Sequence, residues 1–544
     1  MARAVPGRAH PGRIGAQWQA LAVLALVAGA WLRLDRLGTQ IVIDDEWHAL
    51  VKLMRAPMLD IVTHLDYADY SIPLTVYLRW MQDTAGLTEW TIHLPMLAAG
   101  IALVALAPWL ARTWAALPAR ATWAVLLAVS PLLVYFSRTA RPYAITALTS
   151  TLAIVAFERW WRGDTHRDRW AVAYVAATFA GGWLHMTTLA FTLTPFLYAG
   201  VRAIAHDRAL LLRLVRLGLA TALPLAVVLL PPVINDWFSF SAKAGVDSVT
   251  PASAGRTLLM LSGTPHAIVA LVLLACALAG LARVWHRDRV LAGYVVTLLA
   301  VGTLAIVAAR PNWVQHPLVF ARYLVPALPL YLLLAADGIA GGLALRRPGV
   351  APIAIAFAAA VLVVAGPLPA TWTSPNQFTG HLRWQFDYDD AHNPYVTKAL
   401  VEPVPAFYRE LAQRPPGSVT LIEAPWRLES HFNPHAWYQQ VHRQNVRIGL
   451  TTPWCGRRDF GEYPETQPGF RFANFVHVPA VLRGETYGAD YLVVHLVPWS
   501  VPPGEKVPWP DIARCLPDVE AKLGPPVFRD ERIAVFALRA EAAR

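Results

Sequence analysis

The chain has 544 residues, of which 56% are hydrophobic and only 15% are charged. A soluble domain usually carries about 25% charged residues, so this composition excludes a chain that is soluble throughout. The net charge of +11 is spread between apolar segments rather than gathered in one polar domain, which argues against a nucleic-acid-binding protein. The sequence therefore indicates a multi-pass membrane protein.

Apolar segments near the ~20-residue length that crosses a bilayer recur between residues 17 and 367. Lys and Arg residues gather at the N-terminus and in alternate loops, and the positive-inside rule places these parts in the cytoplasm. We predict a mainly α polytopic bundle of about eleven transmembrane helices in the cell inner (plasma) membrane, with the C-terminal tail extracytoplasmic. The predicted spans cover residues 17–34, 92–111, 120–137, 142–160, 169–185, 187–205, 212–233, 266–283, 290–309, 323–341 and 349–367.

The first outer loop, residues 35–91, contains an acidic stretch. Asp44, Asp45 and Glu46 follow an apolar run, and His48 lies one helical turn beyond Asp44. An Asp at the bilayer centre costs roughly 2.5–3.5 kcal/mol, so these groups should lie at the interface or face a wet cavity. Acids at a helix start can simply cap it. We interpret Asp45, Glu46 and Asp44 as catalytic, because a carboxylate beside apolar surface can act as a general base, and His48 as a substrate contact.

The same loop carries apolar residues at helical spacing, which predicts short amphipathic helices in the plane of the membrane interface. The two apolar faces consist of Trp47, Leu50, Leu53 and Met54, and of Leu74, Leu78 and Met81.

The second signal is the outer loop between the third and fourth predicted spans. Arg138 and Arg141 stand there against the positive-inside pattern, directly before Pro142 and Tyr143. A guanidinium group matches two phosphate oxygens, although contact with lipid headgroups is an alternative. Arg322, directly before a later span, repeats the pattern. We predict that Arg138, Arg141, Tyr143 and Arg322 bind a phosphate.

Two further outer residues are candidate substrate contacts. His185 lies at the outer end of the fifth predicted span, and Lys243 lies in a later polar loop. A hydrogen-bonded structural role for His185 and a headgroup contact for Lys243 stay open.

After residue 367 the composition becomes that of a soluble domain. Strand-like runs at residues 419–422, 491–494 and 533–536 alternate with helical stretches at 406–413 and 511–523. This pattern predicts two domains, a transmembrane domain at residues 1–367 and an extracytoplasmic α/β domain at residues 368–544. Cys455 and Cys515 could form a disulfide if this tail is outside.

Two metal-like patterns occur in the tail. Asp387-Tyr388-Asp389 is a short motif that recurs by chance. His431, His435 and His442 have helix-like spacing, but Pro434 interrupts a regular helix. We expect neither to bind a metal. The sequence defines no cofactor and leaves a requirement for a divalent metal open.

The motifs together resemble the membrane-embedded GT-C glycosyltransferases, in the branch that includes protein O-mannosyltransferases and lipid A aminoarabinose transferases. The resemblance covers about residues 32–338 and depends on the order of several short motifs: Asp45-Glu46, Ile72-Pro73-Leu74, Leu94-Pro95, Ser137-Arg138, Arg141-Pro142-Tyr143 and Arg322-Tyr323-Leu324. Two departures stand out. The family often has His-Pro-Pro where this chain has Ser71-Ile72-Pro73, and the extra Asp44 leaves open which aspartate is the base.

The resemblance implies transfer of a sugar from a polyprenyl-phosphate carrier to a glycan, lipid or protein acceptor at the outer face. Asp45 would act as the base of an inverting single displacement, with the outer arginines neutralising the departing phosphate. The bilayer and the lipid-linked donor are the expected partners, and nucleic acid is not. Two alternatives are an oligosaccharide ligase or polymerase that uses a lipid diphosphate donor, and a lipid or glycan transporter. A transporter predicts ionisable residues within spans and paired repeats, which the sequence does not show.

Overall fold

The computed structural model describes residues 11–539 apart from 43, 66–70, 164, 207, 347–348, 369–403, 429–433, 453, 456–469 and 499–507. The Asp387-Tyr388-Asp389 motif and His431 lie outside the described residues. Internal contacts divide the chain into unit 1, residues 1–35, 64–67 and 95–368, and unit 2, residues 36–63, 68–94 and 369–544. Unit 1 ends beside the predicted boundary at residue 367. Most of the predicted outer loop, residues 35–91, groups with the C-terminal region.

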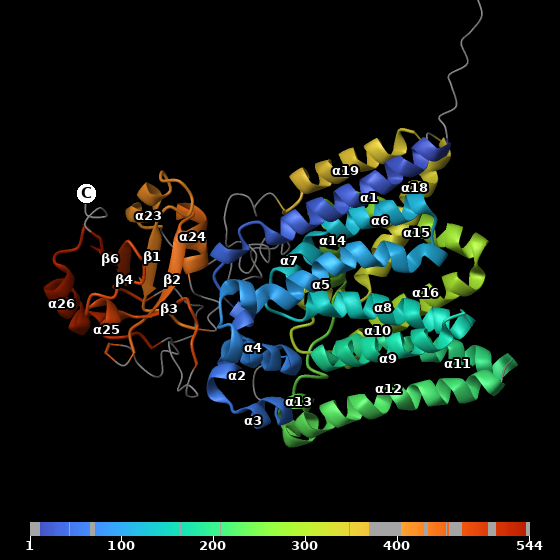
Figure 1. The fold of residues 1–544 in the computed structure, drawn as a ribbon, viewed down its shortest axis with the longest axis horizontal. Coiled ribbons are helices and arrows are strands. Elements are labelled where there is room, and N and C mark those ends of the chain that lie inside the picture. The colour runs from blue at the N-terminus through green and yellow to red at the C-terminus, as the bar shows by residue number, and fades with distance from the viewer. Residues whose placement is uncertain are drawn as a thin grey trace, which may run out of the picture. The chain divides into compact units, whose positions relative to one another are not determined.

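Helices make up the described secondary structure of unit 1 (Figure 1). Each predicted span overlaps one helix or two consecutive helices. Their bounds are α1 (Pro11–Leu34), α5 (Glu89–Leu110), α6 (Leu117–Val129), α7 (Pro131–Ser137), α8 (Tyr143–Arg162), α9 (Arg167–Leu184), α10 (Leu189–Thr192), α11 (Thr194–His206), α12 (Arg208–Asn235), α13 (Trp237–Ser241), α14 (Pro251–Ser262), α15 (Ala267–Arg287), α16 (Arg289–Ala309), α17 (Pro317–Leu324), α18 (Leu328–Arg346) and α19 (Ala351–Ala365).

Four described helices are long and apolar enough to cross a membrane, namely α5, α12, α15 and α16. The number rises to six if the bent pairs α6–α7 and α17–α18 each form one span. Charged residues at the ends of α8 and α9, and the 15-residue length of α19, keep these predicted spans out of that set. The protein is a multi-pass membrane protein, and the topology of about eleven crossings stays a prediction.

The outward faces of the long helices are apolar, as lipid contact requires. Leu223 and Val227 of α12 are 64% and 72% exposed, and Ile268 of α15 is 77% exposed. Such a continuous apolar surface would promote aggregation in water and is stable against acyl chains.

Prolines bend the two broken pairs. Pro131 occupies the first turn of α7, where its missing N–H is tolerated, and α6 and α7 meet at 57°. Pro326 follows α17, and α17 and α18 meet at 80°. Because of these bends, the residues after α7 and at the end of α17 do not lie along the axis of one straight helix.

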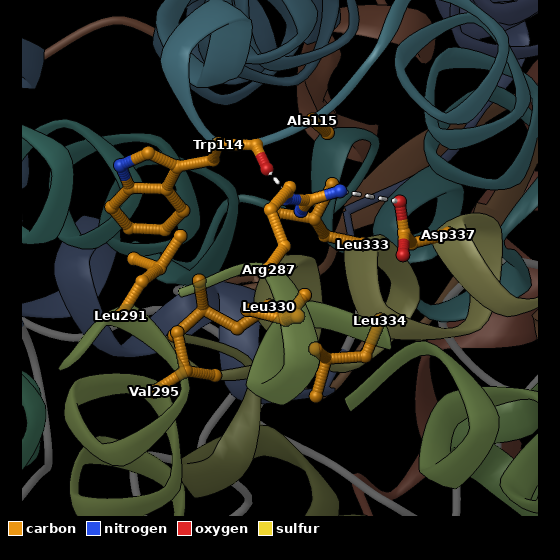
Figure 2. Close-up of a pocket in the computed structure, with 10 residues that line it drawn as sticks. Trp114, Ala115, Arg287, Leu291, Val295, Leu330, Leu333, Leu334 and Asp337 are labelled. Atoms are coloured by element: carbon orange, nitrogen blue, oxygen red, sulfur yellow. Dashed lines mark hydrogen bonds and ion pairs between the residues drawn. The ribbon is translucent and has the colours of Figure 1, made fainter. Parts of the chain in front are cut away.

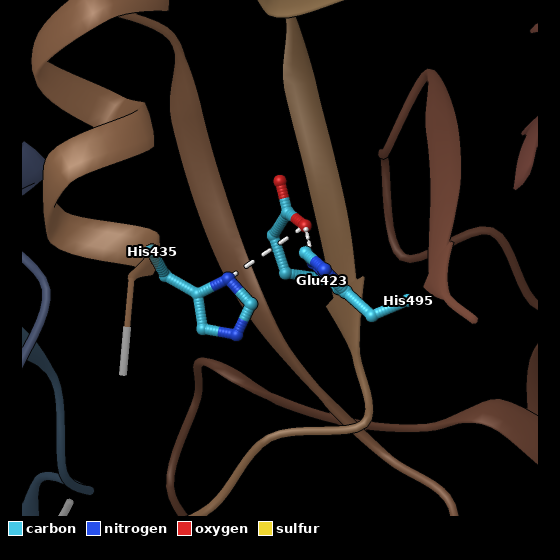
Figure 3. A group of neighbouring side chains, drawn as sticks. All are labelled: Glu423, His435 and His495. Carbon is cyan, nitrogen blue, oxygen red and sulfur yellow. Dashed lines mark hydrogen bonds and ion pairs between the residues drawn. The ribbon is translucent and has the colours of Figure 1, made fainter. Parts of the chain in front are cut away.

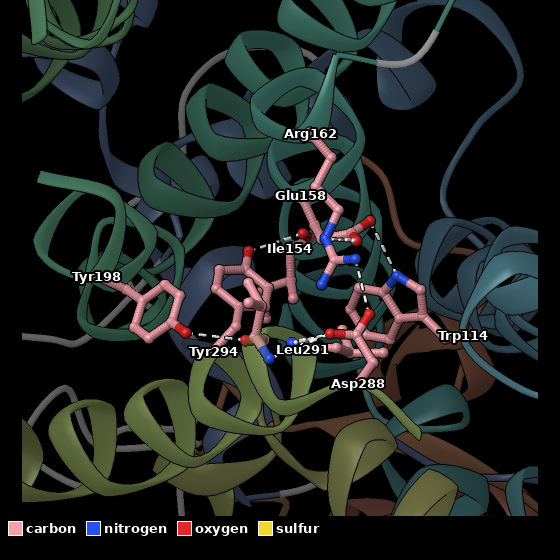
Figure 4. A network of polar contacts seen from close by, with 9 residues as sticks. Trp114, Ile154, Glu158, Arg162, Tyr198, Asp288, Leu291 and Tyr294 are labelled. Carbon is pink, nitrogen blue, oxygen red and sulfur yellow. Dashed lines mark hydrogen bonds and ion pairs between the residues drawn. The ribbon is translucent and has the colours of Figure 1, made fainter. Parts of the chain in front are cut away.

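Polar contacts join α8 to α16 near the arginines predicted to be cytoplasmic (Figure 4). Arg162 contacts Glu158 and Asp288, each at 2.7 Å, and Glu158 accepts a hydrogen bond from the Trp114 indole at 3.0 Å. Asp288 caps α16 by accepting from the Val290 and Leu291 amides. These contacts join the C-terminal end of α8 to the start of α16.

A second set of contacts near this end surrounds a cavity of about 20 Å³ (Figure 2). Arg287 donates to the Trp114 carbonyl, and its guanidinium lies 3.7 Å from Asp337. The rest of the lining is mainly apolar, including Leu291 and Leu330. The cavity has about the volume that one water needs, so it is a packing gap rather than a ligand site.

Unit 2 begins with η1 (Leu37–Thr39), η2 (Asp44–Glu46), α2 (Trp47–Arg55), α3 (Met58–Thr63) and α4 (Ile72–Thr84). The predicted apolar faces exist, but Leu50, Leu53 and Leu78 are fully buried. The apolar faces that suggested helices lying on lipid headgroups are instead packed inside the protein in α2 and α4.

The C-terminal region forms a six-stranded mixed sheet in the order β3-β2-β1-β4-β6-β5. The first four of these run parallel, and β6 is antiparallel to both β4 and β5. The three predicted strands correspond to β1, β4 and β6, and the two predicted helices to α23 and α26. The bounds are β1 (Thr420–Ala424), β2 (Asn445–Leu450), β3 (Phe475–His477), β4 (Tyr491–His495), β5 (Phe528–Arg529), β6 (Ile533–Ala537), α23 (Ala406–Leu411), α24 (His435–His442), α25 (Val478–Val481) and α26 (Ile512–Leu523).

Alternate strand residues feed two cores, which confirms the α/β architecture. One core contains Ile422 and Leu492 with residues of α25 and α26. The other contains Leu421 and Val493 with residues of α23 and α24. Helices therefore cover both faces of the sheet.

Two further features stabilise this domain. Cys455 and Cys515, whose pairing the sequence left open, form a disulfide with Cα atoms 5.9 Å apart. Burial lowers the pKa of His442 to about 3. Its ring is therefore neutral near pH 7, and Nδ1 accepts a hydrogen bond from the Gln444 amide at 3.0 Å.

Candidate functional site

Unit 1 brings four predicted site residues together with Tyr323 in one group. We call it the basic–aromatic cluster, and it consists of Arg141, Tyr143, His185, Arg322 and Tyr323. The Tyr143 ring lies 5.3 Å from the His185 ring, between centroids, and His185 lies 5.8 Å from Tyr323. The Cζ atoms of Arg141 and Arg322 lie 6.0 and 5.9 Å from the Tyr143 centroid. Three segments that are distant in sequence thus converge on Tyr143.

Helix ends position each member of this cluster. Tyr143 begins α8 directly after Pro142, whose φ of −69° suits a helix start. His185 follows α9, and its Nδ1 lies 2.6 Å from Thr187 Oγ1. Arg322 occupies the last turn of α17, just before the proline break.

The chemistry of the cluster suits an anion. Arg141 is only 5% exposed and Tyr143 only 2%, so water screens these groups weakly. Aromatic rings beside guanidinium groups fix their planes by cation–π attraction. Two guanidinium forks held in this way can bind phosphate oxygens in a bidentate manner.

Arg138 has different neighbours. Its guanidinium is 1% exposed and donates to the carbonyls of Leu32 at 3.3 Å, Arg33 at 3.4 Å and Asp35. An arginine that satisfies the last carbonyls of a helix stabilises its C-terminus. Arg138 therefore clamps its loop to the end of α1, and its predicted contact with phosphate stays a prediction.

Arg33 extends this clamp. It is fully buried, and it donates to Ser137 Oγ at 3.1 Å and to the carbonyls of Gly29, Leu127 and Ala128. Two buried arginines thus fix the loop that precedes Arg141.

Gly100 of α5 allows this packing, because a Cβ atom there would lie 1.9 Å from Ser137 Oγ. We expect Gly100→Ala to lower the unfolding free energy by about 1–3 kcal/mol, as overpacking does, and to reduce activity by displacing the loop. Thermal unfolding of the purified protein measures the first effect. Gly200→Ala in α11, where nothing lies within 4 Å of the added Cβ, should be neutral or stabilising. Equal unfolding free energies for the Gly100→Ala and Gly200→Ala variants would contradict the close packing of Gly100 against Ser137.

Lys243 follows α13, and its carbonyl accepts a hydrogen bond from the Asn312 amide at 2.9 Å. The loop after α13 is thereby tied to the segment after α16. The predicted substrate contact of Lys243 stays a prediction.

In unit 2 the acidic stretch forms the 3-10 turn η2, which leads directly into α2. Asp45 is half-buried, and His48 is half-buried on the first turn of α2. Asp44 belongs to the same turn, but its side chain is outside the described part of the structure. Asp45 thus keeps some access to solvent, and its role as a base stays a prediction.

Glu46 has a buried partner that the sequence reasoning missed. Its Oε1 lies 2.7 Å from His93 Nε2, and both side chains are at most 1% exposed. His93 Nδ1 lies 2.6 Å from the Glu89 carbonyl, which can only accept, so Nδ1 carries a hydrogen. A second proton then lies between Nε2 and the carboxylate. Glu46 is the N-cap residue of α2 but makes no side-chain capping bond, so its carboxylate serves this pair. The only sequence signal for His93 was its position directly before Leu94-Pro95.

Trp47 anchors the turn from its other side. Its ring stacks on Phe475 with centroids 5.8 Å apart, meets Phe472 edge-on at 6.1 Å, and its Nε1 donates to the Val42 carbonyl at 2.8 Å. Leu87 also forms a β-bridge with Phe472. These contacts explain why the predicted outer loop groups with the C-terminal region.

We expect Glu46→Ala to lower the unfolding free energy by about 3–5 kcal/mol, because it leaves the buried His93 without its carboxylate. Glu46→Gln should cost less, since an amide oxygen can still face Nε2. Glu485→Ala is the matched control: that carboxylate is 56% exposed and lies 3.6 Å from Arg483, so its loss should change stability by about 1 kcal/mol or less. If thermal unfolding showed equal losses for the two alanine variants, the buried pair would not stabilise the turn.

Unit 2 also contains a polar cavity of about 330 Å³. Thr39 and Glu89 line it from the N-terminal part of the unit, and Asn445, Arg447 and Asn474 from the sheet. Its volume falls at the lower end of the range for small-molecule sites. It could hold a small polar group.

Neither the protein-family models nor the curated proteins contain a match for this chain. Solved structures do match. ArnT from Cupriavidus metallidurans, both in the apo state and bound to undecaprenyl phosphate, aligns over 97% of this chain and 99% of its own, with 15% identity and a TM-score of 0.46. The alignment with ArnT thus covers nearly the full length of both chains.

Two other solved structures also match this chain. The oligosaccharyltransferase of Archaeoglobus fulgidus aligns over 88% of this chain and 68% of its own, with 13% identity and a TM-score of 0.42. Arabinofuranosyltransferase AftD from Mycobacteria aligns over 96% of this chain and 40% of its own, with 15% identity and a TM-score of 0.44.

Proposed function

We propose that this chain is a membrane glycosyltransferase that transfers a sugar from a polyprenyl-phosphate-linked donor to an acceptor on the extracytoplasmic side. The observation that supports it is the convergence of Arg141, Tyr143, His185 and Arg322 in one group. Each of these residues was selected from the sequence for a phosphate or substrate contact. A structural packing role alone would not require two guanidinium groups beside the same tyrosine.

In this proposal Arg141 and Arg322 bind the donor phosphate. Their charge offsets the negative charge that grows on the phosphate oxygen as the bond to the sugar breaks. Tyr143 and Tyr323 hold the guanidinium planes, and His185 contacts the phosphate or the sugar. Arg138 positions the loop through its contacts with the end of α1.

Asp45 acts as the base. It accepts the proton of the acceptor group while the acceptor atom bonds to the anomeric carbon, and the bond from that carbon to the phosphate oxygen breaks. The configuration at the anomeric carbon inverts, and polyprenyl phosphate leaves. Glu46 and its buried partner His93 fix the turn, and Asp44 is the alternative base.

The test is a donor panel with the purified full-length protein in lipid nanodiscs. Labelled sugars on polyprenyl monophosphate and polyprenyl diphosphate are compared, and released polyprenyl phosphate is measured with extracted cell-envelope material as acceptor. We expect turnover with a monophosphate donor. Turnover with diphosphate donors alone would favour an oligosaccharide ligase or polymerase. Movement of intact donor across liposomes without bond cleavage would favour a transporter.

A further inference from the structure

A second group of chemically active side chains lies in the C-terminal domain, and it includes His435 of the histidine pattern noted in the sequence. Glu423 of β1, His435 at the start of α24 and His495 at the end of β4 point toward one another (Figure 3). All three are buried, and one ligand atom from each lies within 4.8 Å of the others. We propose that these residues bind a divalent transition-metal ion, with zinc as the preferred occupant.

The distances between the ligand atoms of these three residues are compatible with their binding one ion. His495 Nε2 lies 2.8 Å and His435 Nδ1 lies 3.8 Å from Glu423 Oε2. Two ligands of a tetrahedral zinc ion, each about 2.0–2.2 Å from the metal, lie roughly 3.3 Å apart, which falls between these values. The longer distance exceeds that of a hydrogen bond. Binding therefore needs only small side-chain shifts.

The donor set indicates the kind of metal. Two imidazoles with one carboxylate suit zinc and neighbouring transition metals, whereas magnesium and calcium prefer oxygen ligands throughout. The position also fits, because Glu423 and His495 lie near the carboxyl ends of neighbouring parallel strands. In open α/β sheets this edge is where ligands bind.

Surrounding residues hold the three ligands in place. The Tyr408 hydroxyl lies 2.9 and 2.8 Å from the two Glu423 oxygens and donates to the carboxylate. Trp426 stacks on the His435 ring with centroids 4.2 Å apart and planes 13° from parallel. Such outer contacts orient the ligands in metal sites. Three protein ligands leave the fourth position of a tetrahedral zinc ion open, and the burial of all three limits the access of solvent to it.

The ion would fasten α24 to the ends of β1 and β4. From α24, Gln439 Nε2 reaches the Thr39 carbonyl at 3.3 Å. A metal here would thus stabilise the segment that leads to the acidic turn of unit 2. The inference concerns stability and stands whether or not the proposed transfer reaction is correct.

The experiment uses full-length protein prepared without a histidine tag, stripped with a chelator and dialysed against zinc. Elemental analysis should give about one zinc ion per chain. Thermal unfolding should show a higher melting temperature for the zinc-loaded protein than for the stripped protein. Magnesium should not raise the melting temperature. The His495→Asn and Glu423→Gln variants should neither retain the zinc ion nor show the rise in melting temperature on addition of zinc. His477→Asn, at an exposed histidine at the end of β3, is the control and should retain both the ion and the rise in melting temperature.

Cobalt titration of the wild-type protein keeps the proposal testable if the ligand variants fail to fold. Nitrogen and oxygen coordination in this site should give a visible absorption that saturates at one equivalent per chain and is displaced by zinc. Absence of that absorption in wild-type protein, or less than one-tenth of a zinc ion per chain, would overturn the proposal. Retention of zinc in folded His495→Asn protein would do the same.

Discussion

Arg322→Ala should lower the turnover number at least a hundredfold while the protein stays folded. The Arg322 guanidinium lies 5.9 Å from the Tyr143 centroid and 5.3 Å from that of Tyr323. In the proposed reaction its charge stabilises the departing phosphate. By analogy with oxyanion-hole donors, losing one such group costs ~2.7–4 kcal/mol of transition-state stabilisation. Arg322→Lys should recover part of the rate, since a point charge remains but the planar fork is lost. Steady-state release of polyprenyl phosphate measures the effect.

Arg310→Asn is the matched control. Arg310 is a second cation on the predicted outer side; it is exposed, and it donates to the carbonyls of Val246 and Asp247. Its φ of 46° lies in the left-handed region, which asparagine tolerates better than alanine. Turnover of this variant should stay near that of the wild type. If Arg322→Ala also retained wild-type turnover, the basic–aromatic cluster would not be the phosphate site.

Arg138→Ala separates the clamp from the phosphate site. Because Arg138 is buried and bonded to the end of α1, its loss should lower the melting temperature as well as the activity. Arg322→Ala should affect activity alone. An Arg138→Ala protein that kept its stability and lost turnover would support the direct phosphate contact predicted from the sequence.

Asp45→Asn should reduce turnover by about 10²–10⁴-fold, the usual contribution of a general base. The substitution keeps the shape of the side chain and removes its ability to accept the acceptor's proton. Donor binding, measured by lipid retention on the purified protein, should be unchanged, because the proposed phosphate contacts come from other residues.

Asp44→Asn is the companion to this variant, since the two aspartates are neighbours in the same turn. We expect Asp44→Asn to keep most of the activity. Loss with Asp44→Asn and retention with Asp45→Asn would assign the base to Asp44. Near wild-type turnover in both variants would place the base outside the acidic turn.

Local pattern was sufficient for the helices at the predicted spans and for three of the six described strands. Helical and strand periodicity report which faces are apolar, so the helix at each predicted span and the strands around Leu421, Leu492 and Val535 could be read directly. The same local logic identified Arg141 and Tyr143, because arginines on the outer side of a membrane need an anionic partner.

Tertiary packing decided what local pattern could not. Arg138 and Arg141 are equivalent in the sequence, yet one binds helix carbonyls and the other meets Tyr143. Glu46 and Asp45 are adjacent, yet only Glu46 turns inward to His93.

Two further features depend on contacts between residues that are distant in the sequence. Glu423, His435 and His495 come from two strands and a helix, and no spacing in the chain links them. The apolar face of α2, which alone suggests contact with lipid, is buried in the protein, with Trp47 packed on Phe472 and Phe475. Spacing along a chain fixes the direction of a side chain from its own helix or strand, whereas the partner it meets depends on which other elements pack there.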